Sequence, residues 1–106
     1  MSYCMIYITC SSKEEAEKIL LTLLEERLAA CGNISPPITS YFHWEGKIDK
    51  AEEVVLIVKT RDEYFGQVES RVTELHSYDI PCIIKLAMAG VNSPYASWID
   101  KELDKE

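Results

Sequence analysis

The sequence has 106 residues, 47% hydrophobic and 27% charged, which is typical of one folded domain and excludes a disordered acidic tail. Eighteen acidic against 11 basic residues give a net charge of −7, which argues against non-specific binding to nucleic acid or to an anionic membrane. No apolar run approaches the roughly 18 residues of a membrane span and no secretory signal pattern is present, so we expect a single cytoplasmic domain over residues 1–106.

The first predicted elements are a buried strand and an amphipathic helix. Tyr3–Cys10 is almost entirely apolar or β-branched, as in a strand buried within a sheet. Ser12 and Glu15 have the spacing of a capping box, and Gly32-Asn33 predicts the end of the helix. Between them, apolar residues recur at helical spacing: Ala16, Ile19, Leu20, Leu23, Leu24 and Leu28.

A long β-hairpin is predicted for Ile34–Thr60. Its first arm, Ile34–Trp44, is rich in β-forming residues, and the returning arm, Lys47–Lys59, ends in an apolar run. Glu45-Gly46 supplies the turn, because glycine adopts a positive φ without steric clash. Each arm is longer than the usual strand of about five or six residues, so the hairpin should project beyond the domain and present an unpaired edge.

The rest of the chain predicts a helix, a strand and a short last helix. Thr60 and Glu63 repeat the capping-box spacing before a helix over Arg61–His76. A turn at Ser77–Pro81 leads into a strand over Cys82–Ala89.

The last helix is predicted to begin at Asn92 or Ser93, with Pro94 in its first turn. The charged tail, Asp100–Glu106, is expected to fray. The buried side of this helix should carry four residues: Tyr95, Trp98, Ile99 and Leu103.

This order of elements predicts an α+β, ferredoxin-like βαββαβ sandwich with a long hairpin and an extra C-terminal helix. With helices on one face only, each strand should alternate apolar and polar residues, yet both faces of Tyr3–Cys10 and Val54–Val58 are apolar. A second copy of the chain is the simplest cover for the other face. Pro36-Pro37 cannot donate ladder hydrogen bonds, so they blunt one end of the hairpin edge.

Several sequence blocks, in order and with matching spacing over nearly the whole chain, resemble the CutA family of divalent-cation tolerance proteins. The blocks are Glu26–Ile34, Tyr41–Ile48, Val58–Arg61 and Leu75–Pro81, with Tyr95 and Trp98 in the last helix. The resemblance implies a ferredoxin-like homotrimer whose hairpins exchange edge contacts, a role in metal tolerance with copper as the usual ion, and an architecture like that of the PII signalling proteins. Tyr41, Phe42 and Trp44 are then expected at the subunit contact, where aromatic side chains bury one another.

The metal ligands implied by the resemblance are a cysteine at the end of the first strand and two adjacent histidines. His76 matches the second histidine, whereas Leu75 stands at the first and Ile8 at the cysteine position. Cys10 lies on the same strand face as Ile8, so His76 and Cys10 are the candidate ligands for copper or another divalent cation, bound weakly or at sites shared between subunits. The alternative is that His76 stabilises a helix end and Cys10 packs in the core. His43 is interpreted as a surface or interface residue.

A second candidate site is an intersubunit cleft formed by Lys59, Arg27, Tyr78 and Glu45, in which the two basic side chains would bind a small anion. The alternative is that these residues form ion pairs and turn hydrogen bonds, with Asp79 as an ordinary turn former. The first function predicted is therefore divalent-cation tolerance. The alternative function is a PII-like module that binds an anionic ligand or an unidentified protein partner.

No catalytic residue and no obligatory cofactor is predicted. A Cys10/His76 nucleophile pair lacks an orienting third group, and no glycine-rich phosphate loop occurs among the four glycines. RNA-binding ferredoxin-like domains use aromatic residues on central strands, which Val54–Val58 lacks. We therefore expect a non-enzymatic protein without nucleic-acid or membrane partners.

Overall fold

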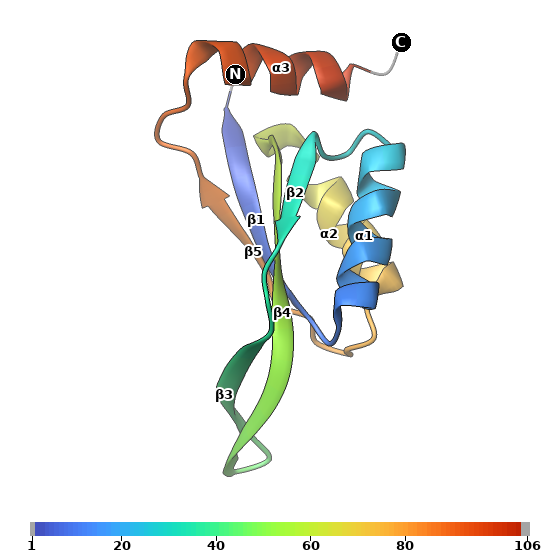
Figure 1. Cartoon of the computed structure of the whole chain (residues 1–106), viewed down its shortest axis with the longest axis vertical. Helices are drawn as coiled ribbons and strands as arrows, with labels where there is room; N and C mark the ends of the chain where they lie inside the picture. Colours follow the sequence, from blue (N-terminus) through green and yellow to red (C-terminus); the bar gives the residue numbers. More distant parts are fainter. Residues whose placement is uncertain (1, 105–106) are drawn as a thin grey trace.

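The computed structural model describes residues 2–104 as a five-stranded antiparallel sheet with helices α1 and α2 on one face and α3 across one end (Figure 1). The strands lie in the order β2–β4–β1–β5, and β3 pairs with the outer part of β4. This is the predicted ferredoxin-like arrangement with an extra C-terminal helix. The elements are β1 (Tyr3–Cys10), α1 (Lys13–Glu25), β2 (Cys31–Ile34), β3 (Ile38–Trp44), β4 (Lys47–Arg61), a 3₁₀ turn (Asp62–Tyr64), α2 (Phe65–Leu75), β5 (Ile83–Ala87) and α3 (Ser93–Leu103).

The hydrophobic core lies between the sheet and the two helices. Alternate residues of β1 are fully buried on the helix face, as the period-two geometry of a strand requires. Ile19 and Leu23 of α1 and Val68 and Val72 of α2 pack against them with no exposed area. The strand residues of this core are Cys4, Ile6, Ile8, Cys10, Val54, Leu56 and Val58.

The start of α1 is as predicted, with one difference. Ser12 is the N-cap, and its hydroxyl oxygen accepts a hydrogen bond from the Glu15 N–H at 3.1 Å. The Glu15 carboxylate accepts from the Ser11 N–H at 2.9 Å, where a capping box would use the N–H of Ser12 itself.

The predicted helix end at Gly32-Asn33 is wrong. α1 ends at Glu25, and Arg27 takes the left-handed conformation that closes it, with φ of 57°. The Leu28 N–H then donates to the Leu23 carbonyl oxygen at 2.9 Å, which is a Schellman closure without glycine. Gly32-Asn33 lies in β2 instead.

The hairpin turns where the sequence predicts, and Glu45 and Gly46 both have positive φ, 51° and 78°. Its first arm is not the continuous strand predicted for Ile34–Trp44, because Ser35–Pro37 separates β2 from β3. Ser35 keeps this break attached to β4: its N–H donates to the Val55 carbonyl oxygen at 2.9 Å, and its hydroxyl accepts the Val55 N–H at 2.8 Å.

The predicted helix over Arg61–His76 begins later, at Phe65, and no capping box forms. β4 continues to Arg61, and the fully buried Thr60 hydroxyl donates to the Leu28 carbonyl oxygen at 2.7 Å. Thr60 and Arg61 are in the strand and not in a helix, because the pairing with β1 extends to the end of β4.

The C-terminal elements are shifted by a few residues. β5 is shorter than the predicted Cys82–Ala89. Trp98 is 39% exposed and does not belong to the buried side of α3 with Ile99 and Leu103. The predicted fraying is wrong for Asp100–Leu103, which is helical; Asp100 accepts a hydrogen bond from the Tyr3 hydroxyl at 2.8 Å. Lys105 and Glu106 lie outside the described residues.

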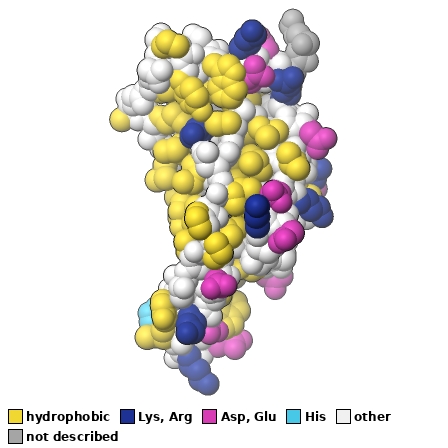
Figure 2. Space-filling view, viewed as in Figure 1, with side chains coloured by type: hydrophobic (Ala, Val, Ile, Leu, Met, Phe, Trp, Pro, Cys, Tyr) yellow, Lys and Arg dark blue, Asp and Glu magenta, His cyan; other side chains and the backbone are white. Residues whose placement is uncertain are grey.

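The sheet face opposite α1 and α2 is open, and we call it the open face. Tyr7 is in register with Ile57 on one side and with Ile84 on the other, so three large side chains adjoin there. Ile84 is 49% exposed and Leu86 47%. Figure 2 shows hydrophobic side chains gathered on the side of the molecule away from the two helices.

Gly32 gives a test of the packing between α1 and β2. A β-carbon there would lie 2.5 Å from a methyl group of Leu20 and 3.1 Å from the Ile57 carbonyl oxygen. We expect Gly32→Ala to lower the free energy of unfolding by about 1–3 kcal/mol, measured by urea denaturation. Gly66→Ala is the control, because nothing lies within 4 Å of its β-carbon and alanine favours the helix by up to about 1 kcal/mol. Equal stabilities of the two variants would contradict the packing described here.

Candidate functional site

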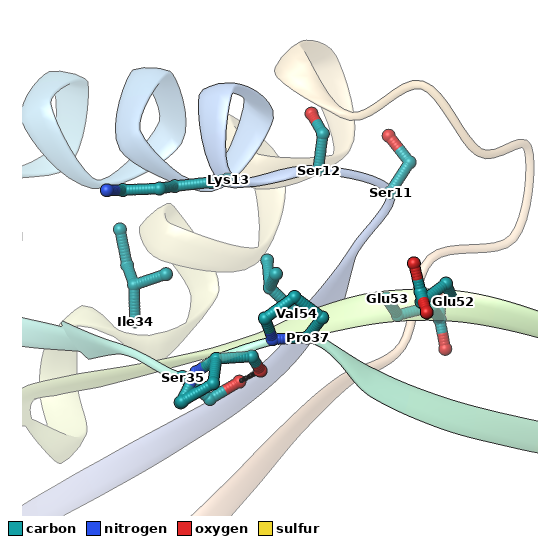
Figure 3. A pocket seen from close by; sticks show the side chains of 10 residues that line it. Ser11, Ser12, Lys13, Ile34, Ser35, Pro37, Glu52, Glu53 and Val54 are labelled. Carbon is teal, nitrogen blue, oxygen red and sulfur yellow. Dashed lines mark hydrogen bonds between the residues drawn. The ribbon is translucent and has the colours of Figure 1, made fainter.

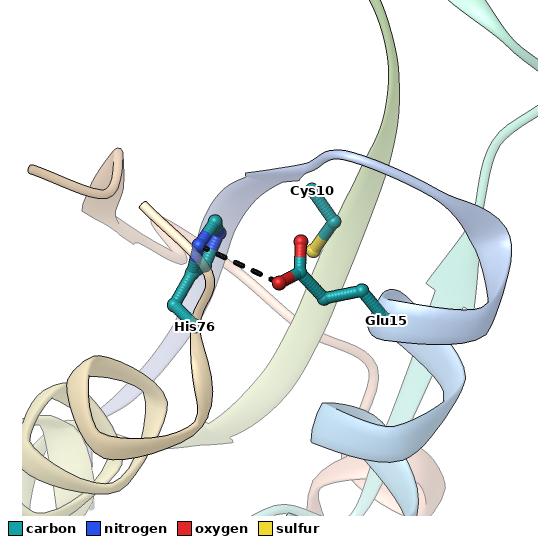
Figure 4. A group of neighbouring side chains, drawn as sticks. All are labelled: Cys10, Glu15 and His76. Carbon is teal, nitrogen blue, oxygen red and sulfur yellow. Dashed lines mark ion pairs between the residues drawn. The ribbon is translucent and has the colours of Figure 1, made fainter. Parts of the chain in front are cut away.

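Three side chains that can act as metal ligands converge where β1 ends, α1 begins and α2 ends (Figure 4). They are Cys10, Glu15 and His76, and one ligand atom of each lies within 4.8 Å of the others. Within residues 2–104, no other set of three or more His, Cys, Asp or Glu side chains is this close. The structure thus brings the two predicted candidates together within one chain, where the sequence predicts weak binding or sites shared between subunits, and adds Glu15.

Both nitrogen atoms of His76 have hydrogen-bond partners. The side chain is fully buried, Nε2 lies 2.8 Å from the Thr9 carbonyl oxygen, and Nδ1 accepts the Tyr78 N–H at 3.1 Å. A carbonyl oxygen can only accept and an amide N–H can only donate, so Nε2 carries the proton and Nδ1 does not. A metal ion could therefore bind Nδ1 only after the bond from Tyr78 is broken.

Glu15 joins two separate segments through its carboxylate. Oε1 accepts from the N–H and the hydroxyl of Ser11, both at 2.9 Å, and Oε2 accepts the Ser77 N–H at 2.7 Å. Burial by itself raises the pKa of Glu15, but the hydrogen bonds from Ser11 and Ser77 outweigh it and lower the pKa from 4.5 to about 2. Oε2 lies 3.9 Å from Nδ1 of His76.

The thiol of Cys10 is protonated at neutral pH. Burial, followed by the negative charges of Glu15 and Glu53, raises the pKa of Cys10 to about 12. The thiolate is the form that binds metal, so an incoming ion must displace this proton. Sulfur, nitrogen and oxygen donors together suit copper or zinc, so the residue types fit such an ion. The hydrogen bonds that these side chains already make oppose its binding.

Within one chain, Arg27, Lys59 and Tyr78 of the predicted intersubunit cleft make other contacts. The Arg27 guanidinium pairs with the Glu102 carboxylate at 3.2 Å, and the Lys59 ammonium lies 5.8 Å from the centre of the Tyr95 ring. Tyr78 donates its hydroxyl to Glu53 at 2.8 Å, and Glu45 is at the hairpin turn. His43 is exposed on β3.

The aromatic residues predicted at a subunit contact line a cavity. Tyr41, Phe42 and Trp44 are 70%, 39% and 54% exposed on the hairpin. With the turn after α2 they enclose about 620 Å³, which we call the hairpin cavity. Its lining consists of Thr9, Ser40, Tyr41, Phe42, Trp44, Asp49, Ala51, Glu53, Tyr78, Asp79, Ile80 and Cys82.

A second cavity, of about 490 Å³, lies between the start of α1 and the break after β2 (Figure 3). Ser11, Ser12 and Lys13 line one side, and Glu52 and Glu53 lie on β4 opposite them. Hydroxyl groups and charges of both signs are mixed here, so the lining selects no single class of ligand.

Comparison with known proteins assigns the family. A family model described as "CutA1 divalent ion tolerance protein" matches residues 4–102. The chain belongs to the CutA family. A relative from Archaeoglobus fulgidus, named "Divalent-cation tolerance protein CutA", is 48% identical over 93% of this chain and 96% of its own. A relative of the same name from Pyrococcus horikoshii is 41% identical over 95% of this chain and 98% of its own.

Solved CutA structures have the same fold. That of CutA from Archaeoglobus fulgidus, described as periplasmic, has a TM-score of 0.94 at 47% identity, covering 96% of this chain and 99% of the other. That of CutA1 from Oryza sativa has a TM-score of 0.95 at 33% identity, covering 100% of this chain and 97% of the other.

The hydrogen bonds of Glu15 predict a measurable pH dependence of stability in the metal-free protein. Because the folded-state pKa is lowered, the stabilisation is complete above about pH 4.5 and is lost as the pH falls toward 2. This lowering of the Glu15 pKa corresponds to a contribution of about 3 kcal/mol to the free energy of unfolding. We expect wild type to lose up to about that much more stability than Glu15→Gln between pH 5 and pH 2, measured by chemical denaturation. Glu14→Gln, in the same helical turn and exposed, is the control and should behave as wild type. Parallel pH profiles for wild type and Glu15→Gln would contradict the assignment.

Proposed function

We propose that this chain acts in divalent-cation tolerance as a homotrimer, with Cys10, Glu15 and His76 of each subunit providing a weak position for copper or another divalent ion. The observation that carries the proposal is the convergence of these three ligand types within 4.8 Å. The names of the Archaeoglobus fulgidus and Pyrococcus horikoshii relatives support the same class of function. The metal is a transient ligand here, and we propose no enzymatic activity.

The trimer is supported by the open face. Ile84 and Leu86 of β5 are exposed there, beside the half-buried Tyr7 of β1 and Ile57 of β4, as at a surface that buries itself against another copy. The exposed aromatic residues of the hairpin, chiefly Trp44 and Tyr41, would extend this contact. Edge pairing through the hairpins would join the subunits.

The compartment and other partners belong to the same proposal. Within residues 2–104, no helix has the length and apolarity needed to cross a membrane. We propose a cytoplasmic location and no nucleic-acid partner, given the acidic charge. A PII-like platform for an anionic ligand in an intersubunit cleft remains the alternative, with Arg27 and Lys59, which both contact α3, as its basic side chains.

The open face gives the test of assembly. Ile84→Lys places a charge beside Tyr7 on this face and is expected to convert trimers into monomers at micromolar concentration, measured by native mass spectrometry and sedimentation. Leu21→Lys is the control, because Leu21 is 58% exposed on the outer side of α1, away from that face. A wild-type monomer, or an Ile84→Lys trimer as stable as wild type, would rule out this interface.

Copper titration of the metal-free trimer under reducing conditions tests the metal position. We expect up to one ion per subunit in native mass spectra, with affinity reduced at least about tenfold in His76→Ala and in Cys10→Ser. His43→Ala and Cys31→Ser are matched controls, since both residues lie outside the cluster. Thermal melts of each variant separate loss of ligands from loss of fold. Copper uptake that does not change in either cluster variant would refute the assignment.

A further inference from the structure

The ligands of the Cys10–Glu15–His76 cluster are buried. Cys10 and the side chain of His76 have no exposed area, and 12% of the Glu15 side chain is exposed. An ion from solvent reaches such ligands only after a segment that covers them moves. The turn Ser77–Pro81 directly follows His76, belongs to no helix or strand, and has mostly exposed residues. This turn is therefore the segment whose movement would open the cluster.

Two residues of the turn are bonded to the cluster and to the sheet. Ser77 donates its N–H to the Glu15 carboxylate at 2.7 Å. Tyr78 donates its N–H to Nδ1 of His76 at 3.1 Å and its hydroxyl to the Glu53 carboxylate at 2.8 Å. The atoms that hold the turn closed thus include atoms of two of the three candidate metal ligands.

The bond from the Tyr78 N–H excludes a metal ion from the same nitrogen. A neutral imidazole has one nitrogen with a free lone pair, and on His76 the Tyr78 N–H occupies it. The other ring nitrogen donates its proton to the Thr9 carbonyl oxygen, so rotating the ring would break both bonds. Coordination by His76 therefore requires the release of Tyr78. Glu15 differs, because a carboxylate oxygen has a second lone pair and can bind an ion while it keeps the Ser77 N–H.

The hydroxyl of Tyr78 makes this release more costly without touching a metal ligand. Its acceptor, Glu53, is 8% exposed and lies at the base of the hairpin, in register with Ile38. A nearly buried carboxylate that loses its donor is destabilised. The Tyr78 ring also packs against that of His76, with the ring centres 4.7 Å apart. The bond to Glu53 and the ring contact both keep the Tyr78 N–H on His76.

We propose that Tyr78 sets the metal affinity of the cluster by competing with the ion for Nδ1 of His76. With Tyr78 on His76 and Glu53 the turn is closed; when His76 coordinates through Nδ1, Tyr78 is released and the turn opens. The inference rests on the metal position proposed above and adds that closure of the turn and metal binding oppose each other. The competition takes place within one subunit, so it needs no open surface on the hairpin.

Tyr78→Phe tests the competition, because it removes the bond to Glu53 and keeps the ring, the backbone N–H and all three ligands. Copper titration by native mass spectrometry, under reducing conditions, is expected to show at least about threefold tighter binding than in wild type. The metal-free variant should nevertheless melt at a lower temperature. A purely structural role for Tyr78 has the opposite sign, since loosening the segment next to His76 would weaken a preformed site. Unchanged or weaker copper binding in Tyr78→Phe would overturn the proposal.

Tyr3→Phe is the matched control. The Tyr3 hydroxyl also donates to a carboxylate at 2.8 Å, that of Asp100, and Tyr3 is at the other end of β1 from Cys10. This variant should lower the melting temperature and leave copper affinity as in wild type. Tighter copper binding in Tyr3→Phe as well would mean that general loosening of the fold, and not release of Tyr78, sets the affinity, and would also overturn the proposal.

Hydrogen exchange of the wild type reports on the turn itself. Copper(I) is expected to speed exchange of the Tyr78 amide at least about tenfold, measured by nuclear magnetic resonance, and to leave the amides of α3 unchanged. Unchanged or slower exchange of the Tyr78 amide in the copper-loaded protein would refute the competition while the metal position stands. Failure of the proposed metal position itself gives a different result: neither wild type nor Tyr78→Phe would take up copper, and the competition would fall with it.

Discussion

The carboxylate of Glu15 is the interaction on which the candidate metal cluster depends. It accepts hydrogen bonds from Ser11, at the start of α1, and from Ser77, directly after His76. Hydrogen bonds to an ionised acceptor are stronger than neutral ones, and the lowered pKa of Glu15 reflects their strength. Glu15 thereby fixes the turn after α2 against the end of β1. His76 and Cys10 are neighbours because these two segments are joined there.

The end of β1 separates the metal cluster from the hairpin cavity. Cys10 faces the helices and belongs to the metal cluster, whereas Thr9 faces the other way and lines the hairpin cavity. Tyr78 connects them: its ring lies 4.7 Å from that of His76, and its hydroxyl binds Glu53. The one-sided placement of α1 and α2 makes this division possible, because the second face of the sheet stays open along the hairpin.

Periodicity predicted the order of the strands and helices, because that order depends on local pattern, whereas the metal pair followed from the resemblance to the CutA family. Predictions from periodicity failed where a contact between residues distant in sequence determines the end of a strand or helix. Thr60 remains in β4 because the carbonyl oxygen of Leu28 is available to it, and α1 closes at Arg27 because Leu28 can be buried. Glu15 was visible only as a capping residue; its bond to Ser77 spans 62 positions and leaves no local signal. The pairing of Arg27 with Glu102 of α3 likewise spans 75 positions and leaves no local signal.

The hydrogen bonds of the cluster also bear on how tightly it could hold a metal ion. Coordination by His76 Nδ1 would replace the bond from Tyr78, and coordination by Cys10 would release a proton from a thiol whose pKa is about 12. Each of these losses subtracts from the free energy of binding, so the cluster should bind copper more weakly than a preformed set of free ligands. The proton released makes binding stronger as the pH rises. A position that is stable when empty and binds weakly suits a protein that responds to an excess of metal, whereas a structural metal would leave its ligands unsatisfied when removed.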